Sequence, residues 1–197
     1  RGDQAWEFEP LNGNNYFRCY TPGVGTAFDR GGGTGTGRHA TMGAAMAYLG
    51  GPRIVWSLLQ AINNLSRFFL NDALLIDPLE ARDLCKKISL NAFGLQGMTG
   101  QATSDDPRAA RNQFEPILRK LHQAIRHHMA GPGGEKPNNT TVGWVQKIYV
   151  SVFGFSRGAA SARAFANWMV ALCKLDAQLL GKPGMTLAGF TVNFDFI

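Results

Sequence analysis

The chain has 197 residues, of which 45% are hydrophobic and 17% are charged. This balance is typical of a folded globular protein and excludes a disordered, low-complexity chain. The formal net charge of +6 suits an anionic partner such as a phospholipid surface or nucleic acid and fixes neither, and a protein that is simply basic has the same balance. No run of about 18 apolar residues occurs, so the sequence predicts no membrane-spanning helix.

Three cysteines, Cys19, Cys85 and Cys173, lie far apart, and no two of them form a CxxC pair. An odd and scattered set argues against a disulfide framework and against a zinc site. We therefore expect each cysteine to be a small, buried, apolar side chain.

The first part of the chain predicts a strand and two helices separated by glycine-rich turns. We expect a strand at 15–20, a turn at 21–26, a flexible glycine-rich loop at 31–37, an alanine-rich helix near 40–48 and, after a break at Gly50-Gly51, an amphipathic helix at 52–69. The apolar residues of the last helix recur at helical spacing, so we expect it to pack against a sheet.

Residues 71–140 predict a helical insert or cap. A short helix is expected near 78–87, and a longer amphipathic helix at 107–129 has apolar residues on one side and arginine, lysine and histidine on the other. This basic helix either lies on anionic lipid or packs on its own domain with a solvated basic face. Adjacent His127 and His128 point to different helix faces, which argues against a metal site.

The last part of the chain predicts a strand, a helix and a second strand. The β-branched and aromatic run at 147–153 indicates a buried central strand, followed by a helix at 157–173 and a strand at 190–197. The order of strands and helices along the chain indicates an α/β fold, with a mostly parallel sheet flanked by helices.

The motif that carries chemistry is GFSRG at residues 154–158, between the predicted strand and the following helix. A serine at such a sharp turn projects its hydroxyl above the sheet edge, and Gly154 and Gly158 are small because strand and helix approach closely there. The backbone N–H of Arg157 would then face a developing oxyanion. Ser156 is therefore a candidate nucleophile, and the alternative is an ordinary tight turn from strand to helix.

The sequence around this motif resembles one α/β-hydrolase family, long catalogued only as a domain of unknown function. That family includes the first class of lipase effectors delivered by bacterial type VI secretion systems. The resemblance runs from about Tyr16 to Asn167, with a poor match at 71–140, and rests on GFSRGAA at 154–160, ARAFAN at 162–167, YTPGVGT at 20–26, the loop at 31–37, Gly50-Gly51 and Arg53-Ile54.

The resemblance implies a phospholipase that cleaves an acyl ester of a glycerophospholipid through a Ser-Asp-His triad, with Ser156 as nucleophile. It implies lipid degradation by an antibacterial toxin, secreted into the periplasm of a target cell, with an immunity protein and a type VI spike protein as partners. Without that delivery the protein would be cytoplasmic. No metal or organic cofactor is required, and no nucleic acid is expected as a partner.

The triad acid and base of such hydrolases follow the serine in the chain. All four histidines, His39, His122, His127 and His128, precede Ser156. Asp195 is either the triad acid or a strand acid beside the true site. We therefore expect residues 1–197 to form an incomplete piece of a larger hydrolase.

Two other functions stay open at this point. One is an intracellular esterase of the same fold, and the other is a catalytically incomplete hydrolase that serves as a binding module. Gly35, Gly37 and Ala40 match a dinucleotide fingerprint poorly, because no strand precedes them and no acidic residue stands at the right place on a second strand. No Lys-Ser or Lys-Thr follows the glycines, which excludes a P-loop.

Overall fold

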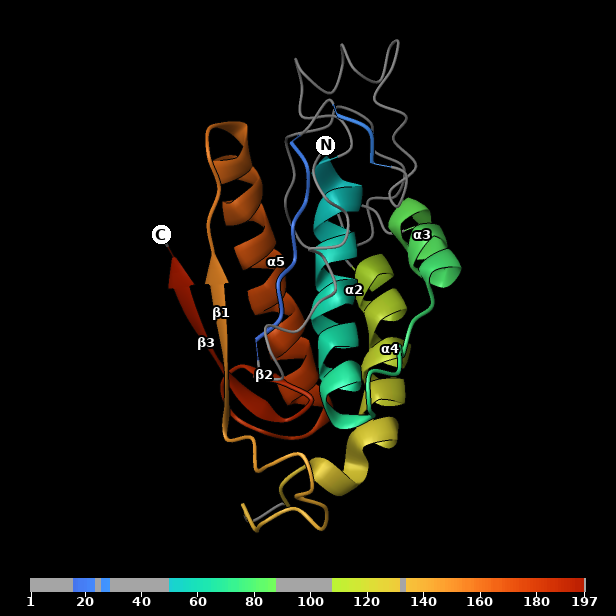
Figure 1. Cartoon of the computed structure of the whole chain (residues 1–197), viewed down its shortest axis with the longest axis vertical. Coiled ribbons are helices and arrows are strands. Elements are labelled where there is room, and N and C mark those ends of the chain that lie inside the picture. Colours follow the sequence, from blue (N-terminus) through green and yellow to red (C-terminus); the bar gives the residue numbers. More distant parts are fainter. Residues whose placement is uncertain (1–15, 24–25, 29–49, 88–107, 132–133, 197) are drawn as a thin grey trace.

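A computed structural model describes residues 16–23, 26–28, 50–87, 108–131 and 134–196. The helices and strands in these ranges (Figure 1) are α2 (Gly50–Phe69), α3 (Pro78–Lys87), α4 (Arg108–Ile125), the single 3₁₀ turn η4 (Arg126–His128), β1 (Lys147–Val152), α5 (Arg157–Leu179), β2 (Thr186–Leu187) and β3 (Phe190–Phe196). The chain therefore has an α/β fold.

The described sheet has three strands in the order β1-β3-β2. β1 runs parallel to β3, with Lys147 opposite Thr191 and Ser151 opposite Asp195, whereas β2 is antiparallel to β3. The prediction of a central position for β1 is wrong for this sheet, because β1 is an edge strand among the described strands. Its residues alternate between exposed and half-buried, as in a strand that is covered on one face only.

The helices lie on one side of this sheet (Figure 1). α5 lies next to the sheet, α2 packs beside α5, and α3 and α4 lie against α2. One hydrophobic core joins these elements, with Leu58, Phe114, Leu121, Trp168 and Leu172 fully buried at its centre. Within the described residues, no helix combines the length and apolar character needed to cross a bilayer.

α2 confirms the predicted amphipathic helix, but it begins at Gly50 rather than at residue 52, so Gly50 and Gly51 are its first two residues. Its buried face follows the predicted helical spacing. The buried amide of Asn63 fixes the chain that follows α2, because its Oδ1 accepts from the N–H groups of Leu75 and Ile76 while Nδ2 donates to the Ile76 carbonyl. The predicted helix at 40–48 lies outside the described residues.

α3 has the predicted bounds, and its start has a clear physical cause. Asp77 accepts hydrogen bonds from the N–H groups of Leu79 and Glu80, and Pro78 occupies the first helical position, where its missing N–H is not needed. α4 and η4 together match the predicted helix at 107–129 closely. Both helices share the core with α2 and α5.

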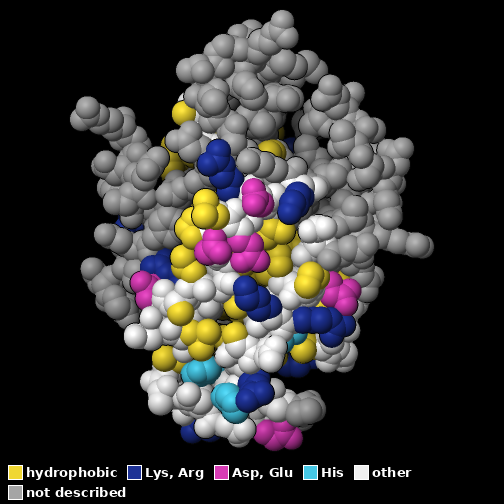
Figure 2. Space-filling model, turned by 90° about the vertical axis from the view of Figure 1, so that its right-hand side faces the viewer, with side chains coloured by type: hydrophobic (Ala, Val, Ile, Leu, Met, Phe, Trp, Pro, Cys, Tyr) yellow, Lys and Arg dark blue, Asp and Glu magenta, His cyan; other side chains and the backbone are white. Residues whose placement is uncertain are grey.

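The outer face of α4 is basic, but it is not a continuous basic surface. Arg119 pairs with Glu115 on the same helix, and Lys120 lies 3.8 Å from Glu80 of α3. Figure 2 shows the α3 and α4 face with acidic and hydrophobic side chains interspersed among the basic ones. This arrangement favours the second interpretation of the helix, a packed helix with a solvated face.

The predicted strand at 15–20 is wrong for the residues described there. Residues 16–23 have no strand pairing, and Tyr16 and Tyr20 are exposed. One of the aromatic residues that favour a strand, Phe17, has a different role here: its ring lies 5.7 Å from the guanidinium of Arg67.

A buried carboxylate fixes the far end of α5. Asp176 is fully buried, and its two oxygens accept from the N–H groups of Ala188 and Gly189, from the Thr186 hydroxyl and from His122, whose Nε2 lies 2.6 Å away. Ala188 and Gly189 both have positive φ, of 51° and 78°, as the tight hairpin between β2 and β3 requires. Asp176 therefore ties this hairpin and α4 to α5.

Replacing Asp176 with alanine removes the acceptor of four donors at once. We expect Asp176→Ala to lower the free energy of unfolding by about 3–5 kcal/mol, because buried donors lose their partner. Urea denaturation measures this change. The matched control is Asp83→Ala on the exposed side of α3, expected to change stability by less than about 0.5 kcal/mol. An equal effect of the two substitutions would contradict the role of Asp176.

The three cysteines do not share one environment. Cys85 and Cys173 are buried, as predicted, but Cys19 is exposed, so the prediction is wrong for that residue. It lies in the segment expected to be a strand, and without strand pairing the side chain stays at the surface. Burial raises the pKa of the Cys85 and Cys173 thiols from 9.0 to about 12, with the nearby Asp176 adding to the effect at Cys173.

We expect a thiol reagent at mildly alkaline pH to modify Cys19 quickly in the folded protein and the other two cysteines only after unfolding. A rise of three pKa units leaves about a thousandfold less thiolate, and burial blocks access as well. Mass spectrometry of partly labelled protein identifies the modified residue, and Cys19→Ser should abolish the fast phase. Fast labelling of Cys85 or Cys173 under native conditions would contradict the burial described here.

Candidate functional site

Ser156 has a backbone conformation that serine rarely adopts. Its φ is 54° and its ψ is −123°, and the N–H of Gly158 donates to the Phe155 carbonyl at 2.8 Å. These angles and this bond define a type II′ turn with Ser156 in the position that glycine normally occupies. A side chain at this position costs on the order of 1–3 kcal/mol, so the residue is a candidate for function.

The turn connects the parallel pair of strands to the helical layer. β1 ends at Val152, the turn follows, and α5 begins at Arg157. In Figure 1 α5 and α2 both start toward the upper end of the molecule, and β1 points toward that end. Ligands of parallel α/β sheets bind beyond the carboxyl ends of the strands, and Ser156 occupies that location.

The two glycines of the motif differ in their structural role. A Cβ atom at Gly154 would lie 2.3 Å from the carbonyl oxygen of Gly158 and 2.8 Å from the amide nitrogen of Ala159. The first glycine is therefore required by the close approach of strand end and helix start. No described atom lies within 4 Å of a Cβ at Gly158. The expectation of a close approach is borne out by these contacts at Gly154 and not at Gly158.

The side chain of Ser156 lies at the surface of the molecule. Ser156 is exposed, as are Phe155 and Arg157, and its side chain makes no capping hydrogen bond to α5. Arg157 is the first residue of α5, where backbone N–H groups point out of the helix and the helix dipole favours negative charge. Amides at a helix start are one kind of donor from which an oxyanion site can be built.

A buried arginine organises the loop at the start of α2. Arg53 donates through Nε to the Pro22 carbonyl at 3.0 Å and through a terminal nitrogen to the Thr26 carbonyl at 2.8 Å, and its guanidinium lies 4.9 Å from the ring of Phe28. Burial lowers the pKa of the Arg53 guanidinium below its ordinary value. Arg53 therefore ties the described parts of the 21–26 turn to the helix that begins at the same end as α5.

The described histidines lie at the other end of the molecule. His122 contacts Asp176, which stands twenty residues after Ser156, a distance of about 30 Å along α5. His127 and His128 belong to η4, beyond the end of α4 (Figure 1). The structure therefore brings none of these three to Ser156, and His39 lies outside the described residues.

Asp195 lies on β3, opposite Ser151 of β1, and is exposed. β3 pairs with β1, the strand that leads to Ser156. The β1 residue opposite Asp195 is Ser151, which comes five residues before Ser156 in the chain. Its role as triad acid stays a prediction. The loop at 31–37 and the strand end at Ile197 lie outside the described residues.

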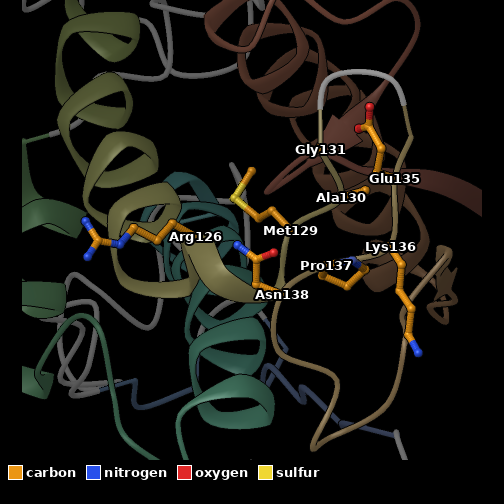
Figure 3. Close-up of a pocket in the computed structure, with 8 residues that line it drawn as sticks. All are labelled: Arg126, Met129, Ala130, Gly131, Glu135, Lys136, Pro137 and Asn138. Atoms are coloured by element: carbon orange, nitrogen blue, oxygen red, sulfur yellow. The ribbon is translucent and has the colours of Figure 1, made fainter.

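A hollow of about 340 Å³ lies far from this site, beside η4 (Figure 3). Arg126, Met129, Glu135 and Lys136 contribute to its lining. Figure 3 shows the charged ends of Arg126 and Lys136 pointing away from each other, so the hollow lacks the convergent polar groups of a ligand site. The described residues contain no group of three or more His, Cys, Asp or Glu side chains that could hold a metal ion.

Sequence reasoning missed the contact between Asp176 and His122. One signal was present: Asp176 is separated by three, four and seven residues from Cys173, Leu172 and Met169, so it lies on the apolar stripe of α5. A carboxylate on such a stripe requires buried donors.

Comparison with known proteins gives no further assignment. No protein-family profile matches the chain, and neither a curated protein nor a solved structure shows significant similarity to it.

The two glycines of the turn provide a matched pair of substitutions. We expect Gly154→Ala to lower the free energy of unfolding by about 2 kcal/mol or more, because the added carbon collides with backbone atoms that cannot move independently. Gly158→Ala places alanine in open space within a helix and should be neutral or stabilise by up to about 1 kcal/mol. Thermal and urea unfolding measure both variants, and similar costs for the two would contradict this turn geometry.

Proposed function

We propose that the chain is part of a serine hydrolase of the α/β-hydrolase fold, with Ser156 as the nucleophile of a phospholipase of the A type. The observation that carries this proposal is the type II′ backbone of Ser156 between β1 and α5. Glycine would fit this position without strain, so a serine there suggests that the hydroxyl is needed. Its exposure and its place at the carboxyl end of β1 support the same conclusion.

In the proposed reaction, the Ser156 hydroxyl attacks the carbonyl carbon of an acyl ester while a histidine base takes its proton. The ester carbonyl becomes an oxyanion beside the Arg157 amide, and collapse of this intermediate expels the lysophospholipid alkoxide, which receives the proton. Water then attacks the acyl-enzyme, releases the fatty acid and restores the hydroxyl. The base comes from outside the described residues, and Asp195 is the candidate acid.

Phospholipid as substrate is the more specific part of the proposal. It is supported by the resemblance of residues 154–160 to the type VI lipase effectors and by the net charge of +6, which favours an anionic surface. Delivery to a target-cell periplasm, a spike protein and an immunity protein are proposals that rest on the same resemblance. An esterase of the same fold differs from this proposal only in its substrate.

A second candidate function is a binding module without catalysis. It is favoured by one observation: the three described histidines lie at the end of the molecule opposite Ser156. Without a base, the serine of the turn would keep its unusual backbone but would not react.

Substitutions of Ser156 separate these candidates. We expect Ser156→Ala to abolish labelling by a fluorophosphonate probe and to reduce fatty-acid release from phospholipid by about a thousandfold or more. Ser156→Gly should be equally inactive, yet its free energy of unfolding should exceed that of Ser156→Ala by about 1 kcal/mol, because glycine relieves the strain of the positive φ. Active-site labelling, lipid hydrolysis and urea denaturation measure the three quantities.

The control is Ser161→Ala, since Ser161 lies one helical turn further along α5 and its hydroxyl donates to the Arg157 carbonyl. This variant should keep labelling and hydrolysis. Full lipase activity in Ser156→Ala would disprove the assignment of the nucleophile. A folded parent protein that takes up no probe would favour the binding module, and turnover of soluble short-chain esters without phospholipid hydrolysis would favour the esterase.

A further inference from the structure

Several exposed aromatic side chains lie in the chain segment that leads to Ser156. The described residues contain eight exposed large hydrophobic side chains, and four of these lie within residues 144–155, namely Trp144, Tyr149, Phe153 and Phe155. The exposed fractions of Phe153 and Phe155 are 76% and 93%. Large apolar side chains that are so fully exposed within one short segment of the chain indicate an interaction surface.

The strand geometry places two of these rings on one face. Side chains of β1 alternate, so Tyr149 lies on the outer face of β1, and Phe153, which follows the strand directly, continues the same alternation. The intervening Ile148 and Val150 pack against the core. Tyr149, Phe153 and Phe155, which we call the aromatic patch, thus lead along the outer side of β1 to the candidate nucleophile.

The exposed charges on the elements next to the aromatic patch are mainly basic. Lys147 on β1 and Arg157 and Arg163 on α5 are exposed, and the exposed acid on the neighbouring strand β3 is Asp195. An aromatic surface with a basic border suits the interface of a bilayer that contains anionic lipid, where rings enter the headgroup region and cations contact phosphates. A protein partner of this face would need to complement the same positive charge.

We propose that the aromatic patch docks the protein on an anionic phospholipid bilayer and thereby places Ser156 at the level of the lipid esters. The proposal rests on the proposed function, since it names how that site meets its substrate. Ser156 stands between Phe155 and Arg157 in the turn. Insertion of the Phe155 ring into the bilayer and contact of the Arg157 side chain with lipid phosphates hold the Ser156 hydroxyl at the boundary between headgroups and acyl chains. The solvated face of α4, with its intermixed acids, does not contribute to this docking.

Co-sedimentation with vesicles tests the proposal without hydrolysis. The protein carries Ser156→Ala so that the vesicles stay intact, and the vesicles contain phosphatidylcholine and phosphatidylglycerol in about equal amounts. We expect the added pair Phe153→Ser and Phe155→Ser to weaken binding by roughly tenfold or more, because two rings no longer enter the interface. Arg163→Gln should weaken binding to these vesicles at low salt and leave binding to pure phosphatidylcholine unchanged.

The matched control is Leu79→Ser, because Leu79 is 74% exposed and belongs to α3, a helix that lies on the side of the helical layer away from the sheet (Figure 1). This control should bind like the parent, and thermal unfolding should show that all variants are folded, since the replaced side chains are exposed. Vesicle binding that is unchanged when both phenylalanine rings are removed would overturn the proposal. So would a loss of binding in Leu79→Ser as large as that in the paired phenylalanine variant.

A second result would also overturn it. If light scattering shows that the parent is a dimer and that the paired phenylalanine variant is a monomer, the patch joins two copies of the chain rather than binding lipid.

Failure of docking is distinguishable from failure of the proposed function. Binding is measured without the nucleophile, whereas turnover of a soluble short-chain ester by the protein with Ser156 tests the nucleophile without vesicles.

Discussion

The structure of the candidate site depends on the close approach between the end of β1 and the start of α5. The chain must reverse within a few residues, and this brings Gly154 so near the Gly158 carbonyl that any side chain at Gly154 would collide with it. The reversal also forces a positive φ at Ser156. Exposure of the hydroxyl, its place above the strand end and its position before the first amides of the helix all follow from this one constraint.

The opposite end of α5 is held by a different kind of interaction. The buried carboxylate of Asp176 accepts hydrogen bonds from donors on α4 and on the hairpin between β2 and β3. The helix thus joins a strained turn at one end to a fully hydrogen-bonded anchor at the other. Strain of a few kcal/mol at a turn persists only where the surrounding structure fixes the chain, and the core around Trp168 and Leu172 supplies that support.

The features that depend on neighbouring residues in the chain could be predicted from the sequence. The helix at 78–87 has a capping aspartate, a proline at its first position and its own apolar spacing, and the strand, turn and helix around Ser156 carry local composition signals. Features that depend on partners far away in the chain could not be predicted from the sequence. The position of β1 in the sheet depends on which strands pair with it, and the aromatic residues at 16–20 favour a strand only where a partner strand is present. The contact between Asp176 and His122, fifty-four residues apart, was likewise hidden, although the apolar stripe around Asp176 indicated its burial.

The positive φ at residue 156 also limits which nucleophile this turn can carry. A side chain that branches at Cβ crowds the backbone at such angles, so threonine would be poorly accommodated where serine fits. Cysteine has the same unbranched Cβ as serine and could occupy the turn without new strain. The backbone alone therefore leaves a change from oxygen to sulfur chemistry accessible by a single substitution, while it disfavours a threonine enzyme on this scaffold.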